Sequence, residues 1–332
     1  MNSTLKTTLI IFFVLTITFT LLFFYVNAFG SVVKKDRTDL ENKFYSQLDH
    51  DKKKVFLVGS SHVARLNETY IQEYLFKNNK DYEVYNLASP AETPKERLPF
   101  IDAMIAAKPD IVVYGVGYRD FLDAVSEFDA TKPPTILPDP SQDFKYGMIS
   151  FERFLNYDFD NFRSPQLVFR YLVRDHFDFN KKPDNQISIY TKTRPFFAFH
   201  GSEGIILNDT QLQKIEEGVT FKFNTMVPYD KSESIYSFKQ IITKLKENNI
   251  KVIVFSTPHT KYYTDKVPPE IRNQFDLTLQ KISQEEEVPV YLLRDKYVDL
   301  PIWNDNHHIA ANPKALIFSQ DIAKIILNET RP

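Results

Sequence analysis

The sequence predicts an α/β fold, a flavodoxin-like three-layer sandwich around a parallel five-stranded sheet. Two observations lead to this prediction. Short apolar runs alternate along the chain with segments whose apolar residues recur at helical spacing, which is typical of parallel strands joined by crossover helices. The first run, residues 55–58, is also apolar throughout, as expected of a strand buried on both faces. Because such crossovers are right-handed, a doubly wound sheet is the expected topology.

Five runs are predicted to be the strands. In chain order they are residues 55–58, 83–85, 108–117, 247–258 and 288–293. The helix expected over residues 67–79 carries Ile71 and Leu75 at a spacing of four, which places both on one face. Further helices are expected over residues 94–107, before the fourth strand around Ile241, over residues 277–283 and over residues 313–327.

The N-terminal segment is uncharged from residue 7 to residue 33 and almost entirely apolar over residues 7–29. This length matches the roughly 20 residues that a bilayer-spanning helix needs. We therefore predict a membrane anchor over residues 1–30, followed by a juxtamembrane linker over residues 31–54. A cleaved signal peptide is the competing interpretation, because Ala28 ends a tolerable cleavage site.

The alternation of strands and helices stops between the third and fourth strands, at about residues 121–237. This segment is rich in proline and aromatic residues. A disordered linker would be poor in aromatic residues, so we predict a folded insertion. Because the insertion leaves the sheet directly after a strand end, we favour a lid over the site, with a second packing layer as the alternative. The α/β domain, insertion included, is predicted to span residues 55–330.

Composition excludes several classes of function. The chain has 332 residues and a formal net charge of -2, so no basic field is present to hold nucleic acid. There is no cysteine, which excludes disulfides, thiolate metal sites and a cysteine nucleophile. No Walker or dinucleotide-binding glycine pattern occurs, and we predict no cofactor.

Polar residues follow the strands at their carboxyl ends, where ligands bind in doubly wound sheets. The loops after the first four strands are Gly59-Ser60-Ser61-His62, Asn86-Leu87-Ala88-Ser89, the segment from Gly115 to Asp120, and Thr257-Pro258-His259. The fifth strand is followed by Trp303-Asn304-Asp305-Asn306-His307-His308. Together these loops supply a hydroxyl nucleophile, a carboxylate and an imidazole at one edge.

Each of these residues has an ordinary structural interpretation when taken alone. Ser61 precedes a predicted helix and could be only its N-cap, and a loop histidine is commonly a surface residue. The combination is more informative, because a serine nucleophile needs an adjacent base and the base needs an orienting group. A metal site of His307, His308 and Asp305 is a weaker alternative, since neighbouring histidines point apart on most backbones.

Four sequence blocks together resemble the SGNH (GDSL-type) hydrolase superfamily. They are the GSSH block at residues 59–62, the loop at Asn86, the GVGYRD block at residues 115–120 and the DNHH block at residues 305–308. The resemblance covers residues 55–120 and 247–328. It implies Ser61 as nucleophile, His308 as general base, Asp305 as its orienting partner, and an acyl-enzyme intermediate.

Three departures from the family pattern affect the site. The glycine of the family's second block has no obvious counterpart, and Asn86-Leu87-Ala88 stands in its neighbourhood. Ser60 stands where the family usually has aspartate, as in membrane-anchored relatives, and Arg119 stands where it usually has asparagine. The standard oxyanion hole is therefore altered, and a guanidinium could take over or bind an anionic group. The residues expected to bind substrate or oxyanion are Gly59, Asn86, Gly117, Arg119 and His259. His62 and His259 are each expected to line the pocket or to act as an alternative base, with a loop histidine without a role as the other interpretation.

The sequence and the resemblance together predict a membrane-anchored serine esterase that deacylates a surface glycan or a lipid-linked polymer. The GSS variant with an N-terminal apolar helix resembles surface O-acyltransferases and D-alanyl transfer proteins, which implies acyl transfer as an alternative and a membrane partner that donates the acyl group. An inactive carbohydrate-binding or scaffold domain is the third alternative. The resemblance places the domain on the extracytoplasmic side, although Lys34, Lys35 and Arg37 after the apolar segment favour the cytoplasm.

Overall fold

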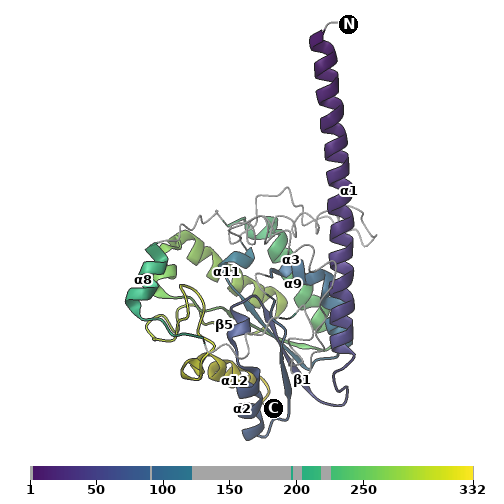
Figure 1. Cartoon of the computed structure of the whole chain (residues 1–332). Helices are drawn as coiled ribbons and strands as arrows, with labels where there is room; N and C mark the ends of the chain where they lie inside the picture. Colours follow the sequence, from purple (N-terminus) through teal and green to yellow (C-terminus); the bar gives the residue numbers. More distant parts are fainter. Residues whose placement is uncertain (1–2, 90–91, 122–195, 197–203, 218–225, 332) are drawn as a thin grey trace, which may run out of the picture. The chain divides into compact units, whose positions relative to one another are not determined.

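The computed structural model describes residues 3–89, 92–121, 196, 204–217 and 226–331 (Figure 1). The chain divides into two compact units. One comprises Met1–Leu40 and Pro133–Ser188, and the other comprises Glu41–Lys132 and Ile189–Pro332. The second unit contains the sheet and every residue of the candidate site.

The predicted five-stranded parallel sheet is confirmed. Its strands are β1 (Lys54–Gly59), β2 (Glu83–Asn86), β3 (Ile111–Val116), β4 (Lys251–Ser256) and β5 (Val290–Leu292). They lie in the order β2-β1-β3-β4-β5, and each neighbouring pair is parallel. This is the flavodoxin-like order, in which ligands bind outside the carboxyl ends of the strands.

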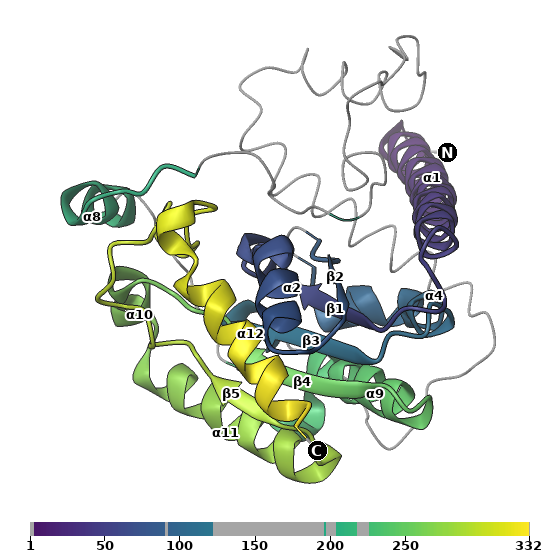
Figure 2. The same cartoon turned by 90° about the horizontal axis from the view of Figure 1, so that it is seen from below.

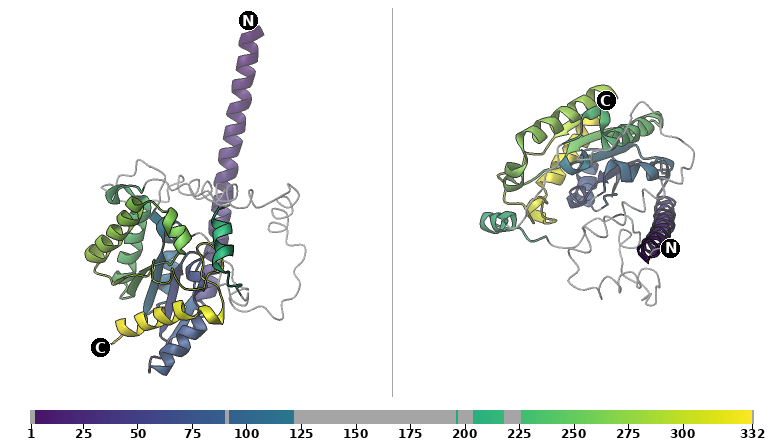
Figure 3. Two further views of the ribbon diagram at one scale, coloured as in Figure 1. Left: turned by 90° about the vertical axis from the view of Figure 1, so that its left-hand side faces the viewer. Right: turned by 90° about the horizontal axis from the view of Figure 1, so that it is seen from above.

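Helices cover both faces of the sheet, which makes the predicted three layers. One face packs against α3 (Pro94–Arg97), α4 (Ile101–Ala106), α9 (Glu233–Glu247) and α11 (Pro269–Glu286). The other face packs against α2 (Glu68–Lys77) and α12 (Ile317–Glu329). These two helices lie side by side in Figure 2, and in the left view of Figure 3 the yellow α12 runs along the blue α2. Alternate residues of β1 point to the two cores, Phe56 to the first and Leu57 to the second.

Two glycines let the chain turn closely onto the end of the sheet. Gly59 ends β1 and pairs with Gly115 of β3. A Cβ atom on Gly59 would lie 2.5 Å from the Gly115 carbonyl oxygen and 2.6 Å from Val63 Cγ2, and the φ of Gly59 is +144°. A side chain at either position would displace Val63, so the glycine pair allows the turn that carries Ser61 to lie on the sheet.

The helix predicted over residues 94–107 is divided into three pieces. Between α3 and α4 lies the 3₁₀ turn η2 (Leu98–Phe100), which contains Pro99. Proline lacks the N–H that an uninterrupted α-helix would need, which explains the break. The predicted C-terminal helix likewise begins as a 3₁₀ turn, η6 (Pro313–Ala315), before α12. The described part of the chain also contains the helices α8 (Asp209–Glu217) and α10 (Lys261–Lys266) and the 3₁₀ turn η5 (Tyr229–Lys231).

The N-terminal segment forms one helix, α1 (Ser3–Tyr45), which includes the predicted anchor. Among the residues that the structure describes, no helical stretch meets the length and hydropathy that membrane crossing requires. The predicted linker is not only a connection, because its residues Glu41, Phe44, Tyr45 and Leu48 are buried in the second unit. Most of the predicted insertion and lid, including residues 122–195, lies outside the described residues.

Candidate active site

The turn that carries Ser61 follows β1 directly. The predicted helix after Gly-Ser-Ser is only a 3₁₀ turn here, η1 (Val63–Arg65), and α2 begins later, at Glu68. The N-cap of α2 is Asn67, whose side chain accepts a hydrogen bond from the Tyr70 backbone N–H at 2.9 Å. Ser61 is therefore not the cap of this helix, and its hydroxyl bonds elsewhere.

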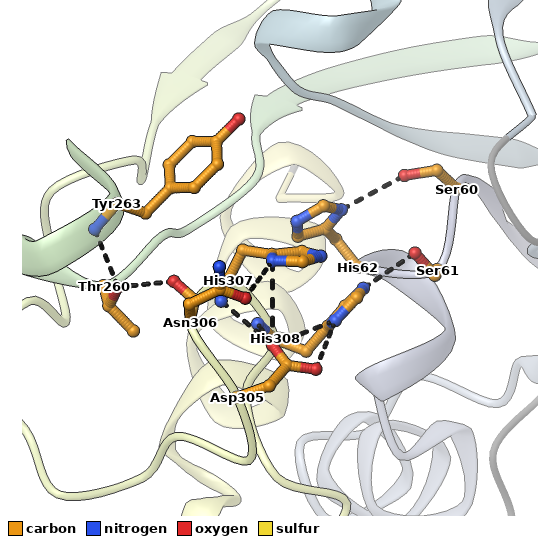
Figure 4. A network of polar contacts seen from close by, with 9 residues as sticks. All are labelled: Ser60, Ser61, His62, Thr260, Tyr263, Asp305, Asn306, His307 and His308. Atoms are coloured by element: carbon orange, nitrogen blue, oxygen red, sulfur yellow. Dashed lines mark hydrogen bonds and ion pairs between the residues drawn. The ribbon is translucent and has the colours of Figure 1, made fainter. Parts of the chain in front are cut away.

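The hydroxyl of Ser61 joins a continuous chain of hydrogen bonds (Figure 4). Ser61 Oγ lies 2.8 Å from His308 Nε2. On the other side of the same ring, His308 Nδ1 lies 2.9 Å from Asp305 Oδ2 and 3.2 Å from Oδ1. The structure thus brings together all three residues that the sequence predicted for a catalytic triad, although Ser61 and His308 are 247 residues apart in the chain. This is the geometry in which an imidazole can take a proton from a serine while a carboxylate orients the ring.

The loop that holds Asp305 and His308 is closed at its base. Trp303 and Ile309 form an antiparallel bridge across it, and the Asn304 N–H donates to the His308 carbonyl oxygen at 2.9 Å. Inside the loop, Asp305 Oδ1 accepts from the backbone N–H groups of His307 at 2.9 Å and of His308 at 2.7 Å. These two bonds hold the Asp305 carboxylate independently of its contact with the imidazole.

Asp305 is held in its charged form. Burial alone would raise its pKa, but the hydrogen bond and charge of His308, with the backbone N–H of His307, hold the pKa of Asp305 well below its usual 3.8. A carboxylate that stays ionised can orient the His308 ring and stabilise it when it becomes positively charged.

Asn86 does not have the role expected for it. It is fully buried at the end of β2, and both hydrogens of its side-chain amide are used, with Nδ2 3.0 Å from the carbonyl oxygens of Val63 and Leu66. Its Oδ1 accepts from the Ala88 N–H at 3.2 Å. Asn86 therefore holds the η1 turn in place and has no donor left for an oxyanion, which corrects the expectation.

The loop after β3 is also committed to internal bonds. The Gly117 N–H donates to Asp120 Oδ2 at 2.6 Å, so this backbone group does not face a substrate. A Cβ on Gly117 would lie 2.8 Å from Thr257 Oγ1, which explains the glycine. Gly59 serves the close approach of the turn rather than binding. Arg119, in contrast, is exposed. Burial and the charge of His308 lower the pKa of His307 most, and the nearby charge of Arg119 lowers it further.

His259 lies inside the site, as expected, but as a packed ring. It is stacked between Tyr118, at 5.4 Å between ring centroids, and Tyr263, at 4.6 Å. Its ring meets His62 edge-on at 4.9 Å. Burial, followed by the charges of His307 and His308, holds the pKa of His259 well below its ordinary value of 6.5, so it stays neutral.

The protein's stability should depend on pH through Asp120. Burial raises the pKa of Asp120 from 3.8 to about 7. The stabilisation from its bound proton is therefore complete below pH 3.8 and is lost as the pH rises through about 7. From about pH 4 to pH 8, the wild-type free energy of unfolding should fall relative to that of Asp120→Asn by up to about 4 kcal/mol, because one pKa unit is worth about 1.36 kcal/mol.

Urea unfolding of both proteins at the two pH values measures this difference. The histidines are the same in both proteins, so their titration largely cancels in the comparison. A wild-type minus Asp120→Asn difference that does not change with pH would contradict a proton on the folded-state carboxyl.

Three contributors to the site were not predicted as such. Asn306 Oδ1 lies 2.6 Å from His307 Nδ1, and the Asn306 carbonyl oxygen accepts a hydrogen bond from the Thr260 hydroxyl at the start of α10. Asp120 was noted only as part of the third loop. The position of Asn306 between Asp305 and His307 could have indicated a role in the site. Nothing in the sequence shows, however, that its side chain turns toward the His307 ring.

Comparison with known proteins gives one family and several distant structures. A family model described as "Protein of unknown function (DUF1574)" matches residues 10–313. No curated protein sequence matches the chain. Among solved structures, the acetyl xylan esterase AlAXEase is 14% identical and matches over 84% of this chain and 100% of its own, with a TM-score of 0.40.

Two further structures are similar to the same degree. TesA is 12% identical and matches over 82% of this chain and 99% of its own. The psychrotrophic esterase EstA from Pseudoalteromonas sp., in a structure inhibited by monoethylphosphonate, is 10% identical and matches over 83% of this chain and 97% of its own. Both have a TM-score of 0.40. Two of these three structures are described as esterases. At this TM-score the likeness carries no argument about activity, which has to come from the site itself.

Proposed function

The chain belongs to the family of proteins of unknown function DUF1574, and because that description names no reaction, we propose one from the site: a serine esterase that removes O-acyl groups. The observation that carries the proposal is the bonded series from Ser61 Oγ through His308 to Asp305, at 2.8 Å and 2.9 Å. A serine at its ordinary pKa is a weak nucleophile, and this series supplies the base that activates it.

The reaction has two half-reactions. Ser61 Oγ attacks the acyl carbon while its proton passes to His308 Nε2, and the alcohol leaves with that proton, which creates a seryl ester. Water then attacks the seryl ester with its proton taken by His308, and the acid is released as Ser61 regains a proton. Asp305 remains ionised throughout and stabilises the positive charge on His308 in both half-reactions.

The oxyanion formed in each half-reaction needs hydrogen-bond donors. The Asn86 amide is used within the fold, and the Gly117 N–H is bonded to Asp120. We assign this part to the Ser61 backbone N–H and the exposed guanidinium of Arg119. Arg119 would also suit a substrate with an anionic group near the ester.

The proposed substrate class and location rest on features of the sequence. We propose an acylated surface glycan or lipid-linked polymer, reached from a membrane-anchored position on the extracytoplasmic side. The supporting features are the apolar segment at residues 7–29 and the resemblance of the GSS block to membrane-anchored relatives. Transfer of the acyl group to a sugar hydroxyl differs from hydrolysis only in which hydroxyl attacks the seryl ester.

A fluorophosphonate probe tests the proposal directly. The wild-type full chain should be labelled once, and mass spectrometry should locate the label on the peptide containing Ser61. An aryl acetate assay with and without a sugar acceptor then separates the two fates of the seryl ester, since an acyltransferase would form an acetylated sugar. A wild-type protein that is not labelled and does not release the aryl alcohol would contradict the esterase and favour a binding or scaffold domain.

A further inference from the structure

Three imidazole rings meet beside Ser61 (Figure 4). His62, His307 and His308 each offer a ring nitrogen, and these atoms all lie within 4.8 Å of one another. The ring centroids are 4.6 Å apart for His62 and His308 and 4.2 Å apart for His307 and His308. The expectation that the neighbouring histidines 307 and 308 point apart is therefore not met.

All three rings are held in the same way, with Nδ1 against an oxygen atom. The pairs are His62 with Ser60 Oγ at 3.3 Å, His307 with Asn306 Oδ1 at 2.6 Å, and His308 with Asp305 Oδ2 at 2.9 Å. A histidine that ligates a metal ion characteristically donates its other ring N–H to an oxygen acceptor, which fixes the tautomer and leaves the second nitrogen for the metal. Here the second nitrogen is Nε2 in each ring.

The region also contains buried nitrogens without a partner. Within the described part of the chain, His62 Nε2 and both ring nitrogens of the neighbouring His259 are buried and make no hydrogen bond. Leaving a buried polar atom unpaired is costly, and such atoms in a native fold call for an explanation. A metal ion bound at His62 Nε2 would satisfy the first of them.

We propose that His62, His307 and His308 bind one divalent transition metal ion of the Zn²⁺ class through their Nε2 atoms. Imidazole nitrogen is a preferred ligand of this class, and three histidines with an open fourth position are a known coordination set. A metal–nitrogen distance of about 2.0 Å in tetrahedral geometry separates the ligands by about 3.3 Å. The ring nitrogens that the three histidines offer now lie within 4.8 Å of one another, so the rings would move closer together on binding, and the fourth position would be left for water or Ser61 Oγ.

Metal binding and ester hydrolysis then exclude each other. The ion takes the lone pair of His308 Nε2, which is the atom that accepts the proton of Ser61. Zn²⁺ should therefore inhibit the enzyme by occupying its general base. This inhibition rests on the proposed esterase function, whereas the binding of the ion does not.

Binding is measured on full-length protein without a histidine tag. We expect ZnCl₂ titrated calorimetrically, and CoCl₂ followed by visible absorption, to give one ion per chain in both the wild type and Ser61→Ala, which keeps all three rings. His62→Gln, and separately His307→Gln, should bind the ions at least about tenfold more weakly. The matched control is His50→Gln, because His50 is an exposed histidine outside the cluster and should leave the affinity unchanged.

The hydrolysis of an aryl acetate supplies the second readout. Zn²⁺ should inhibit the wild type, and EDTA should restore the rate. Absence of one-to-one binding in both wild type and Ser61→Ala, or equal loss of affinity in His50→Gln and His62→Gln, would overturn the metal site and leave the esterase intact. One-to-one binding that depends on His62, in a protein that hydrolyses no ester, would support the metal site and overturn the esterase alone.

Discussion

Replacing Ser61 by alanine should lower kcat for ester hydrolysis by at least about ten-thousandfold. The reason is that Ser61 Oγ is the atom bonded to His308 Nε2, and no other hydroxyl is bonded to that nitrogen among the described residues. Without the hydroxyl no seryl ester forms, and only binding and electrostatic effects remain. Steady-state hydrolysis of an aryl acetate by the purified variant measures the loss, with circular dichroism to establish that it is folded.

Ser60→Ala is the matched control for this prediction. Ser60 is the neighbouring serine, but its Oγ faces His62 Nδ1 at 3.3 Å and not His308. Its loss should reduce the rate far less than the loss of Ser61. A variant pair in which Ser60→Ala is inactive and Ser61→Ala retains most of the rate would show that the nucleophile is Ser60.

Replacing Arg97 by alanine should lower the free energy of unfolding by about 3–5 kcal/mol. Arg97 is completely buried, and its guanidinium contacts two buried carboxylates. Nη1 lies 3.1 Å from Glu41 Oε1, and Nη2 lies 2.7 Å from Glu92 Oε2. Truncation would leave two negative charges in the interior without their shared partner, which costs far more than the loss of an exposed ion pair. Urea unfolding followed by the fluorescence of the single tryptophan, Trp303, measures the change.

An exposed ion pair provides the comparison for Arg97. Lys244 Nζ lies 2.8 Å from Asp102 Oδ1, and the side chains are 39% and 77% exposed, so Lys244→Ala should change the free energy of unfolding by at most about 1 kcal/mol. Arg97→Lys keeps the charge but loses the forked geometry, and it should fall between the two. Equal effects of Arg97→Ala and Lys244→Ala would show that the buried cluster adds no more than a surface pair.

Much of the fold could be predicted because the strands have a strong local signature. Runs such as residues 55–58 and 111–116 are apolar on both faces, and the helix positions at Ile71 and Leu75 recur at the right spacing. Where a boundary depended on a single residue, the prediction was less accurate. Pro99 divides a predicted helix, and the turn after Ser61 is too short to be an α-helix.

The candidate site could be predicted only as far as topology determines it. Parallel strands bring their carboxyl ends to one edge, so Ser61 and His308 could be expected together. Which hydrogen bonds a side chain makes depends on its rotamer and on neighbours far away in the chain. The Asn86 amide is therefore used by Val63 and Leu66 rather than by a substrate, and no local pattern shows this. The convergence of His62 on His307 has the same origin.

The burial of Glu41 determines where a fragment of this protein can begin. The last turn of α1, which contains Glu41, belongs to the unit that carries Ser61. The Glu41 carboxylate accepts a hydrogen bond from Arg97, which lies 56 positions later in the chain. Cleavage of the chain after Ala28 would leave this turn in place, so Glu41 would still pair with the charge of Arg97. A shorter fragment that begins at the first strand, where the sequence becomes recognisably globular, would lack Phe44, Tyr45 and Leu48 from its interior and would expose their partners to solvent. The functional boundary of the domain therefore lies within its N-terminal helix, upstream of residue 41.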